Sequence, residues 1–489
     1  MKVLLAGYNL DYDLIRELKN KSASNQDLTP ETISAAYARI SRSPKHVFEL
    51  REIARVEVDK ARQSNRNIVF AMGHSSVAEH AVFNIDVLGV SRLLVEEIEK
   101  FRLCSFTEKS QRYVLFDKDF VVPEEIQQAG MVGLFTETVM AQNDYYHKLY
   151  EKLKPHIFSR NKDLAQNPSN RLLLEGWAKE DARYVISMAT QTQLGMTINA
   201  RNLELMLRRL ASLPVAEAQE YSKKLYAVTK DIAPSLIRYT QATDYDKLTR
   251  QNLIKKANSY FLKYSVNKRA EKSVAARLTY ASPDADNKIT AALLFSSSNL
   301  TYSQCLNHAK RLTSIERKAL FKAAFEHLQP HDAVLREMEN IDLQFELVPS
   351  ASCFAQLKRH RMSTIIAQEY NPSLGVSVPT SVQEIGQQKT FMDIMRQTEK
   401  AYDQIKKKAP FAAAYVLTNA HRKRVLMKFS ARELYHIARM RADEHAQWDI
   451  RKLTEDMLKQ AKKAMPLTLI LACGKDGFDA LYKKTFKRG

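Results

Sequence analysis

The chain has 489 residues, of which 45% are hydrophobic, and its 75 Lys and Arg against 55 Asp and Glu give a net charge of +20. This length accommodates roughly two to three domains with cores of their own, and 12 Gly and 14 Pro are too few for long disordered tracts. Four widely spaced cysteines argue against a zinc site or a disulfide framework. We therefore expect a globular cytoplasmic protein with anionic partners, without a signal sequence or a membrane span.

The first 240 residues are predicted to form one unit. Pro30 followed by Glu31-Thr32-Ile33 is typical of a helix start. Residues 81–87 alternate apolar and polar side chains with period two and predict a strand, and residues 90–101 predict a helix. Helical periodicity dominates residues 127–232, so we expect mainly helices there.

Residues 241–272 are polar and compatible with a helical linker, and residues 273–489 are similar to the first unit in the order of their elements. The segment at 276–279 is similar to residues 38–41, and residues 340–348 predict a strand equivalent to 81–87. One long helix is expected from about 432 to 463. A tandem duplication accounts for this order.

Three polar residues, Glu108, Ser110 and Arg112, follow one another at spacing two. An extended backbone would direct all three to the same side. A carboxylate, a hydroxyl and a guanidinium together suit a small phosphorylated ligand such as a nucleotide. A solvated edge strand with mixed charges is the alternative interpretation.

Several motifs in the chain resemble the flavin-dependent thymidylate synthases. That family's signature is an Arg-His-Arg triplet, then Ser, then Glu-x-Ser-x-Arg-Tyr. The matching segments are Glu79-His80, Ser91-Arg92, Ser105-x-x-Glu108-x-Ser110-x-Arg112-Tyr113, Gln356-Leu357-Lys358-Arg359-His360-Arg361 and the run from Arg441 to Ile450.

Neither repeat carries the whole signature, and the losses are complementary. In the first repeat the triplet reads Lys100-Phe101-Arg102, preceded by Glu97 in place of Gln, and the catalytic Arg is Leu210. The second repeat keeps the triplet and Arg441. Its replacements are Ala367, Glu369 and Asn371 for Glu108, Ser110 and Arg112, Ala414 for Arg183, and Ser430 for Asn199.

The resemblance implies an α+β fold in two tandem copies, each a small, mainly antiparallel sheet flanked by long helices. It implies conversion of dUMP to dTMP, with methylenetetrahydrofolate as carbon donor, reduced FAD as hydride donor and NADPH as reductant of the flavin. The family shares each active site between subunits of a homotetramer. A duplicated chain is therefore expected to form a homodimer that mimics it, with one class of composite site alive and the other dead.

The resemblance also assigns residue roles. Arg441 would be catalytic, stabilising negative charge on the activated uracil. The expected dUMP-binding residues are Gln356, Arg359, Glu108, Ser110, Arg112 and Arg183. The expected FAD-binding residues are Ser76, His74, Glu79, Arg359, His360, Arg361, Glu108, Asn199, Arg201 and His445.

Other candidate residues receive simpler interpretations. His74 and His80 have no third ligand placed by the sequence, so no metal site is expected. Cys104 is expected to be a buried small hydrophobe rather than a nucleophile. Arg432 and Arg441 should face different sites, because nine helical residues turn them to nearly opposite sides.

Two other functions are compatible with the sequence. The chain could be a relative that binds nucleotide or flavin without transferring a methyl group. It could also bind nucleic acid, as the +20 charge would allow, although it carries no recognised nucleic-acid motif.

Overall fold

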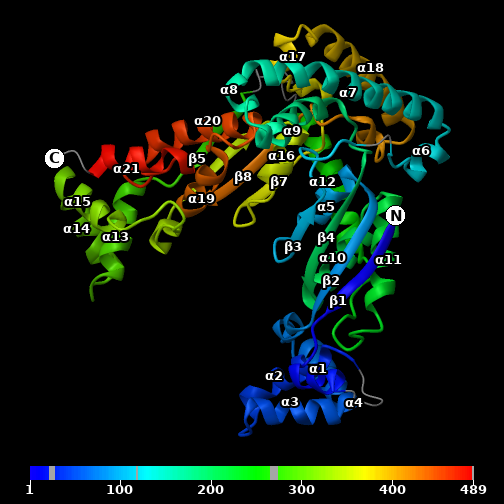
Figure 1. Cartoon of the computed structure of the whole chain (residues 1–489). Coiled ribbons are helices and arrows are strands. Elements are labelled where there is room, and N and C mark those ends of the chain that lie inside the picture. Colours follow the sequence, from blue (N-terminus) through cyan, green and yellow to red (C-terminus); the bar gives the residue numbers. More distant parts are fainter. Residues whose placement is uncertain (21–27, 117–118, 265–273, 487–489) are drawn as a thin grey trace. The chain divides into compact units, whose positions relative to one another are not determined.

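The computed structural model describes residues 1–20, 28–116, 119–264 and 274–486 (Figure 1). Its internal contacts divide the chain into two compact units. Unit 1 comprises Met1–Lys179, Ile186–Lys268 and Arg396–Leu417; unit 2 comprises Glu180–Val185, Arg269–Met395 and Thr418–Gly489. The predicted boundary between linker and second repeat, at residues 272 and 273, lies outside the described residues.

Unit 1 contains a four-stranded antiparallel sheet in the order β1-β2-β4-β3. Its strands are β1 Lys2–Tyr8, β2 Val82–Ser91, β3 Ser105–Glu108 and β4 Gln191–Asn199. Alternate residues of β2 and β4, such as Phe83 and Met196, are buried against Leu207 and Tyr221 of α10 and α11. The strand and the helix that we predicted at 81–101 are thus confirmed.

Unit 2 repeats this topology with the order β5-β6-β8-β7. Its strands are β5 Ala276–Ala281, β6 Asp342–Leu347, β7 Thr364–Ala367 and β8 Val425–Ser430. The equivalent edge strands β3 and β7 end at Glu108 and Ala367, each paired with the central strand. The expected α+β fold in two copies is confirmed.

The remaining described segments are mostly helical, and none of their helices combines the length and apolar composition that a membrane span requires. The α-helices up to the second repeat are α1 Tyr12–Lys19, α2 Glu31–Arg39, α3 Val47–Val56, α4 Val58–Arg66, α5 Arg92–Ile98, α6 Glu124–Gln128, α7 Val132–Arg160, α8 Lys162–Ala165, α9 Arg171–Ala182, α10 Ala200–Ala211, α11 Ala216–Thr229 and α12 Asp244–Lys263. Those that follow are α13 Ala285–Ser296, α14 Tyr302–Arg311, α15 Ser314–Phe325, α16 Ala351–Leu357, α17 Thr380–Glu384, α18 Gln388–Lys408, α19 Ala431–Arg441, α20 Trp448–Ala464 and α21 Phe478–Phe486.

One prediction about equivalent segments of the repeats was wrong. Residues 276–279 are not equivalent to residues 38–41, because the former belong to β5, the counterpart of β1, and the latter to the end of α2 and the turn after it. The range 127–232 is mainly helical, as predicted, and it also contains the strand β4, whose alternate residues Thr192 and Leu194 are buried. Its exposed positions include Gly195, so the period-two signal was weak.

The long helix predicted from 432 to 463 was also wrong, because it breaks between α19 and α20. Gln447 caps α20 by accepting hydrogen bonds from the backbone amides of Asp449 and Ile450. Gly474 packs against Ala442 and Asp443, the first residues after α19. A Cβ atom at position 474 would lie 2.3 Å from the carbonyl oxygen of Ala442. A side chain at position 474 is therefore incompatible with the break.

In each unit, one carboxylate accepts a hydrogen bond from the serine that caps the helix after β2 or β6; Glu217 is buried and Asp449 is half-buried. In unit 1, Glu217 accepts hydrogen bonds from the backbone amide (2.7 Å) and hydroxyl (2.6 Å) of Ser91 and from the Tyr415 hydroxyl (2.6 Å). In unit 2, Asp449 accepts from the hydroxyls of Ser350 (2.5 Å) and Tyr184 (3.0 Å). Burial raises the pKa of both carboxyl groups.

Asp181, in the short segment Glu180–Val185 of unit 2, is a buried carboxylate. Its two oxygens accept from the Trp448 indole nitrogen (2.8 Å) and from the Ser381 hydroxyl (2.5 Å). Burial raises the pKa of Asp181 to about 6. The segment is thus held in unit 2 by Tyr184 and by Asp181.

Replacement of Gly474 by Ala should destabilise unit 2 by about 1–3 kcal/mol, because the backbone on either side must move apart. Gly477→Ala is the matched control, since a Cβ atom there meets nothing within 4 Å. Urea unfolding followed by circular dichroism compares the two. Equal midpoints for both variants would contradict the packing argument.

The raised pKa of Asp181 should make the free energy of unfolding depend on pH. Because its pKa is raised in the folded state, its contribution is complete below about pH 4 and is lost as the pH rises through 6. The free energy of unfolding should therefore fall relative to an Asp181→Asn variant by up to about 1.4 kcal/mol per pH unit in this window. Urea titrations followed by Trp448 fluorescence in a Trp177→Phe background measure it, with the exposed Asp479→Asn as control. A constant difference between pH 4 and 7 would refute the shift.

Candidate functional site

Glu108 lies at the end of β3 in unit 1, and its carboxylate is engaged. The Arg92 guanidinium contacts it at 2.6 Å, with the side chains only 5% and 6% exposed. Arg92 follows the helix-capping Ser91 at the first position of α5. Sequence reasoning quoted Ser91-Arg92 as part of the motif but gave Arg92 no role, and the structure identifies it as the residue that holds Glu108.

Ser110 and Arg112 follow in a turn rather than in an extended row. β3 ends at Glu108, the Ser110 hydroxyl accepts from the Arg112 amide (3.2 Å), and the Tyr113 amide donates to the Ser110 carbonyl (3.4 Å). Lys179 donates to the Tyr113 carbonyl at 3.3 Å. The extended backbone on which the spacing-two prediction depends ends at Glu108, because the strand stops where its pairing with β4 stops.

Arg183 belongs to the first repeat in sequence but to unit 2 in structure. Its carbonyl accepts from the Asn419 amide (3.0 Å), and Gln447 donates to the hydroxyl of the adjacent Tyr184 (2.8 Å). Gln356 donates to the Gln447 side chain at 3.4 Å. A chain of hydrogen bonds thus connects the segment of Arg183 with Gln356.

Arg441, at the end of α19, contacts two residues of the signature region of the second repeat. Its Nε donates to Nε2 of His360 (3.1 Å), and its Nη2 donates to the Gln356 carbonyl (3.3 Å). His360 is only 3% exposed, whereas Arg359 and Arg361 on either side are exposed. The structure therefore brings Gln356, His360 and Arg441 into one contact group and leaves the two arginines of the triplet accessible.

His360 also faces two residues of α19. Its Nδ1 lies 3.4 Å from Glu433 Oε1, and its ring packs edge-on against His436 at 5.5 Å between centroids. Burial lowers the pKa of both histidines. In the part of the chain that the structure describes, this triad and the group Asp443, His445 and Asp476 each bring three potential metal-ligating atoms within 4.8 Å.

The residues expected to bind FAD from the first repeat lie around the start of α10 in unit 1. Arg201 forms an ion pair with Glu79, and Asn199 caps α10 by accepting from the Asn202 amide (3.0 Å). His74 and Ser76 are exposed nearby in the sequence, on the turn before β2. Unit 2 repeats the ion pair with Arg432 and Glu339, at 2.9 Å.

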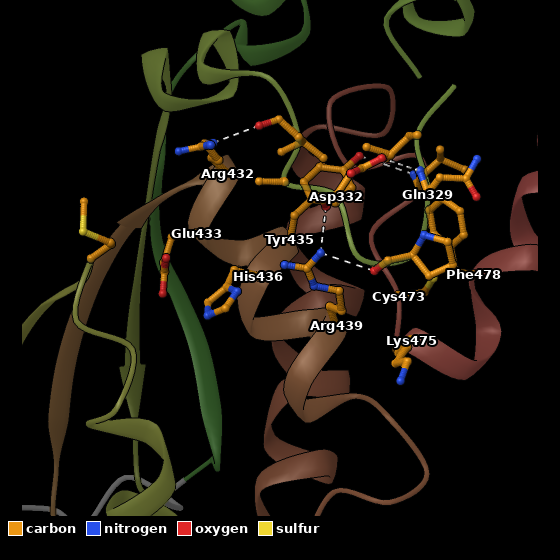
Figure 2. Close-up of a pocket in the computed structure, with 17 residues that line it drawn as sticks. Gln329, Asp332, Arg432, Glu433, Tyr435, His436, Arg439, Cys473, Lys475 and Phe478 are labelled. Carbon is orange, nitrogen blue, oxygen red and sulfur yellow. Dashed lines mark hydrogen bonds between the residues drawn. The ribbon is translucent and has the colours of Figure 1, made fainter. Parts of the chain in front are cut away.

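A cavity of about 270 Å³ lies on the outer face of α19 in unit 2 (Figure 2). Arg432, His436 and Arg439 line it from α19, together with Asp332 and Phe478. Arg432 lines this cavity and Arg441 does not; Arg441 instead contacts His360 and Gln356.

Positions that lost signature residues are packed differently. Leu210, which stands in the first repeat where Arg441 stands in the second, is 1% exposed in the hydrophobic core. Cys104 is buried in the same core, as predicted. The buried hydroxyls of Tyr184 and Tyr415 were not predicted. A tyrosine at the same place in both repeats, after Arg183 in the first and after Ala414 in the second, was the sequence feature that could have predicted them.

Comparisons with known proteins agree with the duplicated architecture. The family described as Thymidylate synthase complementing protein matches residues 25–235 and again residues 262–467. A UPF0159 protein of Chlamydia muridarum is 24% identical over 434 residues, 84% of this chain and 80% of that one. A flavin-dependent thymidylate synthase of Clostridium tetani is 29% identical over 215 residues, 43% of this chain and 82% of that one.

Solved structures include the flavin-dependent thymidylate synthase of Helicobacter pylori complexed with FAD and dUMP. It is 19% identical, covers 49% of this chain and 100% of its own, and has a TM-score of 0.30. The two family matches account for most of the sequence and correspond to the two repeats. The chain therefore belongs to the thymidylate synthase complementing proteins, the flavin-dependent thymidylate synthase family, as a tandem duplication.

Proposed function

We propose that this chain is a flavin-dependent thymidylate synthase that converts dUMP to dTMP, with methylenetetrahydrofolate as carbon donor and NADPH as the source of electrons. The observation that carries the proposal is the contact group of Gln356, His360 and Arg441 in unit 2. Membership of the family adds support. These three residues belong to the half of the signature that the second repeat retains, together with Arg359 and Arg361.

The chemistry proposed for Arg441 follows from its surroundings. A guanidinium stays protonated near neutral pH, and two of its nitrogens are held by His360 and by the Gln356 carbonyl. A fixed positive charge of this kind stabilises the negative charge that develops on a uracil ring as the ring is activated. Arg441 would thus act by electrostatics rather than by proton transfer.

The proposed nucleotide site uses residues of both repeats. Arg112, Arg183 and Arg359 would bind the 5′-phosphate of dUMP through guanidinium hydrogen bonds, with Ser110 as a hydroxyl donor. Gln356 would contact the same nucleotide. Glu108 would act next to them, with its carboxylate oriented by Arg92.

The residues proposed to bind FAD fit that cofactor in chemistry and accessibility. FAD carries a diphosphate, and Arg201, Arg359 and Arg361 are exposed guanidinium groups that suit an anion. His74, Ser76, Glu79, Asn199, His360 and His445 complete the proposed set. When bound, reduced FAD supplies the hydride for the methyl group, and the protein orients the reactants.

The proposal predicts a site in which each repeat supplies what the other lacks. The complementary class of site, with Leu210 in place of Arg441, should be inactive because Leu210 is enclosed in the core. Binding of nucleotide or flavin without methyl transfer is the competing function. It is favoured by the ion pair between Glu108 and Arg92, because this pair already engages the Glu108 carboxylate.

Complementation of a thymidine-requiring bacterial strain tests the proposed function. Wild type should rescue growth, whereas Arg112→Ala and Arg441→Ala should abolish it, and purified Arg441→Ala should lose about 10²–10³-fold in kcat as a lost charge stabiliser. Arg102→Ala is the control, because it alters the degenerate triplet of the first repeat and should retain growth.

The colour and ligand binding of the purified proteins separate the alternatives. Wild type should be yellow with bound flavin and should release labelled dTMP from dUMP. Bound flavin and nucleotide without turnover would favour the binding protein. A colourless wild type that fails to rescue growth would refute the enzyme.

A further inference from the structure

The hydrogen bonds around His360 define where its proton lies. Arg441 Nε is a donor, so His360 Nε2, at 3.1 Å, must accept. A neutral imidazole with an accepting Nε2 carries its proton on Nδ1, and Nδ1 faces the Glu433 carboxylate at 3.4 Å. The burial that lowers the pKa of His360 favours this neutral form.

We propose that Glu433 and His360 are positioning residues that hold the Arg441 guanidinium through a relay, in which Glu433 contacts His360 and His360 accepts a hydrogen bond from Arg441. Glu433 fixes the Nδ1–H tautomer, which leaves the Nε2 lone pair for Arg441 Nε, and the Gln356 carbonyl holds Arg441 Nη2. Two anchors on one edge fix the plane of the guanidinium group. The function of this relay rests on the proposed role of Arg441.

Burial favours the contact between Glu433 and His360. These residues are 6% and 3% exposed, and among the described residues neither Glu433 Oε1 nor His360 Nδ1 has a hydrogen-bond partner of good geometry. Each of these two atoms instead has the other as a neighbour, at 3.4 Å. A buried carboxylate without a partner is costly, so the contact between these two atoms is the available compensation. Figure 2 shows Glu433 and His436 one turn apart on α19.

The first repeat supplies an internal comparison. α10 and α19 both begin after a capping residue, Asn199 and Ser430, so equivalent positions can be read directly. The relay Glu433, His360 and Arg441 is replaced there by Asn202, Phe101 and Leu210. Phe101 packs on the hydrophobic core that contains Leu210. The repeat without an arginine at the position of Arg441 thus also lacks the equivalents of Glu433 and His360, as expected if these two residues position Arg441.

A metal ion bound by His360, Glu433 and His436 is the competing interpretation of the same cluster. Ligation through Nδ1 would require the proton of His360 to move to Nε2. Nε2 would then be a donor facing the donor Nε of Arg441, and the hydrogen bond would be lost. A divalent cation would also lie close to a guanidinium group. The contacts with Arg441 therefore favour the proton relay.

The tautomer of His360 tests the relay directly in the wild-type protein. Long-range ¹H–¹⁵N correlation spectra of protein labelled at histidine nitrogens should show His360 protonated on Nδ1, with the same signals in EDTA and after addition of Zn²⁺. His360→Gln, or the shifts caused by Glu433→Leu, assigns the signals. A proton on Nε2, or ligation of Zn²⁺ by Nδ1, would overturn the relay.

Kinetics of Glu433 variants test its effect on Arg441. Glu433→Leu removes the acceptor and should lower kcat about tenfold or more while KM for dUMP changes less than about twofold. Glu433→Gln keeps an acceptor for Nδ1–H and should restore most of kcat. Glu455→Leu, which removes an exposed carboxylate from α20, is the matched control.

The outcomes separate this inference from the proposed function. If wild type is inactive but His360 is protonated on Nδ1, the relay stands and the thymidylate synthase proposal fails. If wild type is active and Glu433→Leu retains kcat, or loses it only in parallel with its far-ultraviolet circular dichroism, the positioning role is refuted.

Discussion

One carboxylate in each unit, the buried Glu217 or the half-buried Asp449, organises the parts that carry the candidate site. Each accepts hydrogen bonds from the serine that caps the helix after β2 or β6, and from a tyrosine hydroxyl. A desolvated carboxylate requires such donors, because burial without them would cost several kcal/mol. The carboxylate thereby fixes a helix start and a tyrosine-bearing segment at the same point.

The tyrosines come from segments that are exchanged in sequence. Tyr415 belongs to the second repeat but to unit 1, and Tyr184 belongs to the first repeat but to unit 2. Arg183 precedes Tyr184, so the carboxylate of Asp449 determines that this guanidinium is built into the unit that contains Gln356 and Arg441. The hydrogen bond of the Tyr184 hydroxyl thus places the neighbouring Arg183 in unit 2, and a comparison of motifs alone does not include this contact.

The sequence predicted most of this architecture where local patterns were strong. Period-two burial located β2, the cap at Pro30 located α2, and the signature residues located the contact group around Arg441. It failed where distant contacts decide the structure. The break after α19 depends on Gly474 lying against Ala442, more than thirty residues apart, and the turn at Ser110 depends on where pairing with β4 ends. Neither is encoded in the local residues.

The packing around Leu210 gives a physical reason why the first repeat has an apolar residue where the second has Arg441. Leu210 is enclosed among apolar side chains, including Leu207 and Met206. An arginine there would bury a charge with no carbonyl or imidazole acceptor of the kind that Arg441 has in His360 and Gln356.

An arginine at Leu210 would therefore be difficult to introduce by a single substitution. Restoring the arginine at Leu210 would also require an acceptor at Phe101 and a carboxylate at Asn202, each inside a packed region. Until all three changed together, every intermediate would leave a buried polar group unpaired. Under the proposed function, Arg441 and its acceptors in the second repeat are therefore the set that a working site requires.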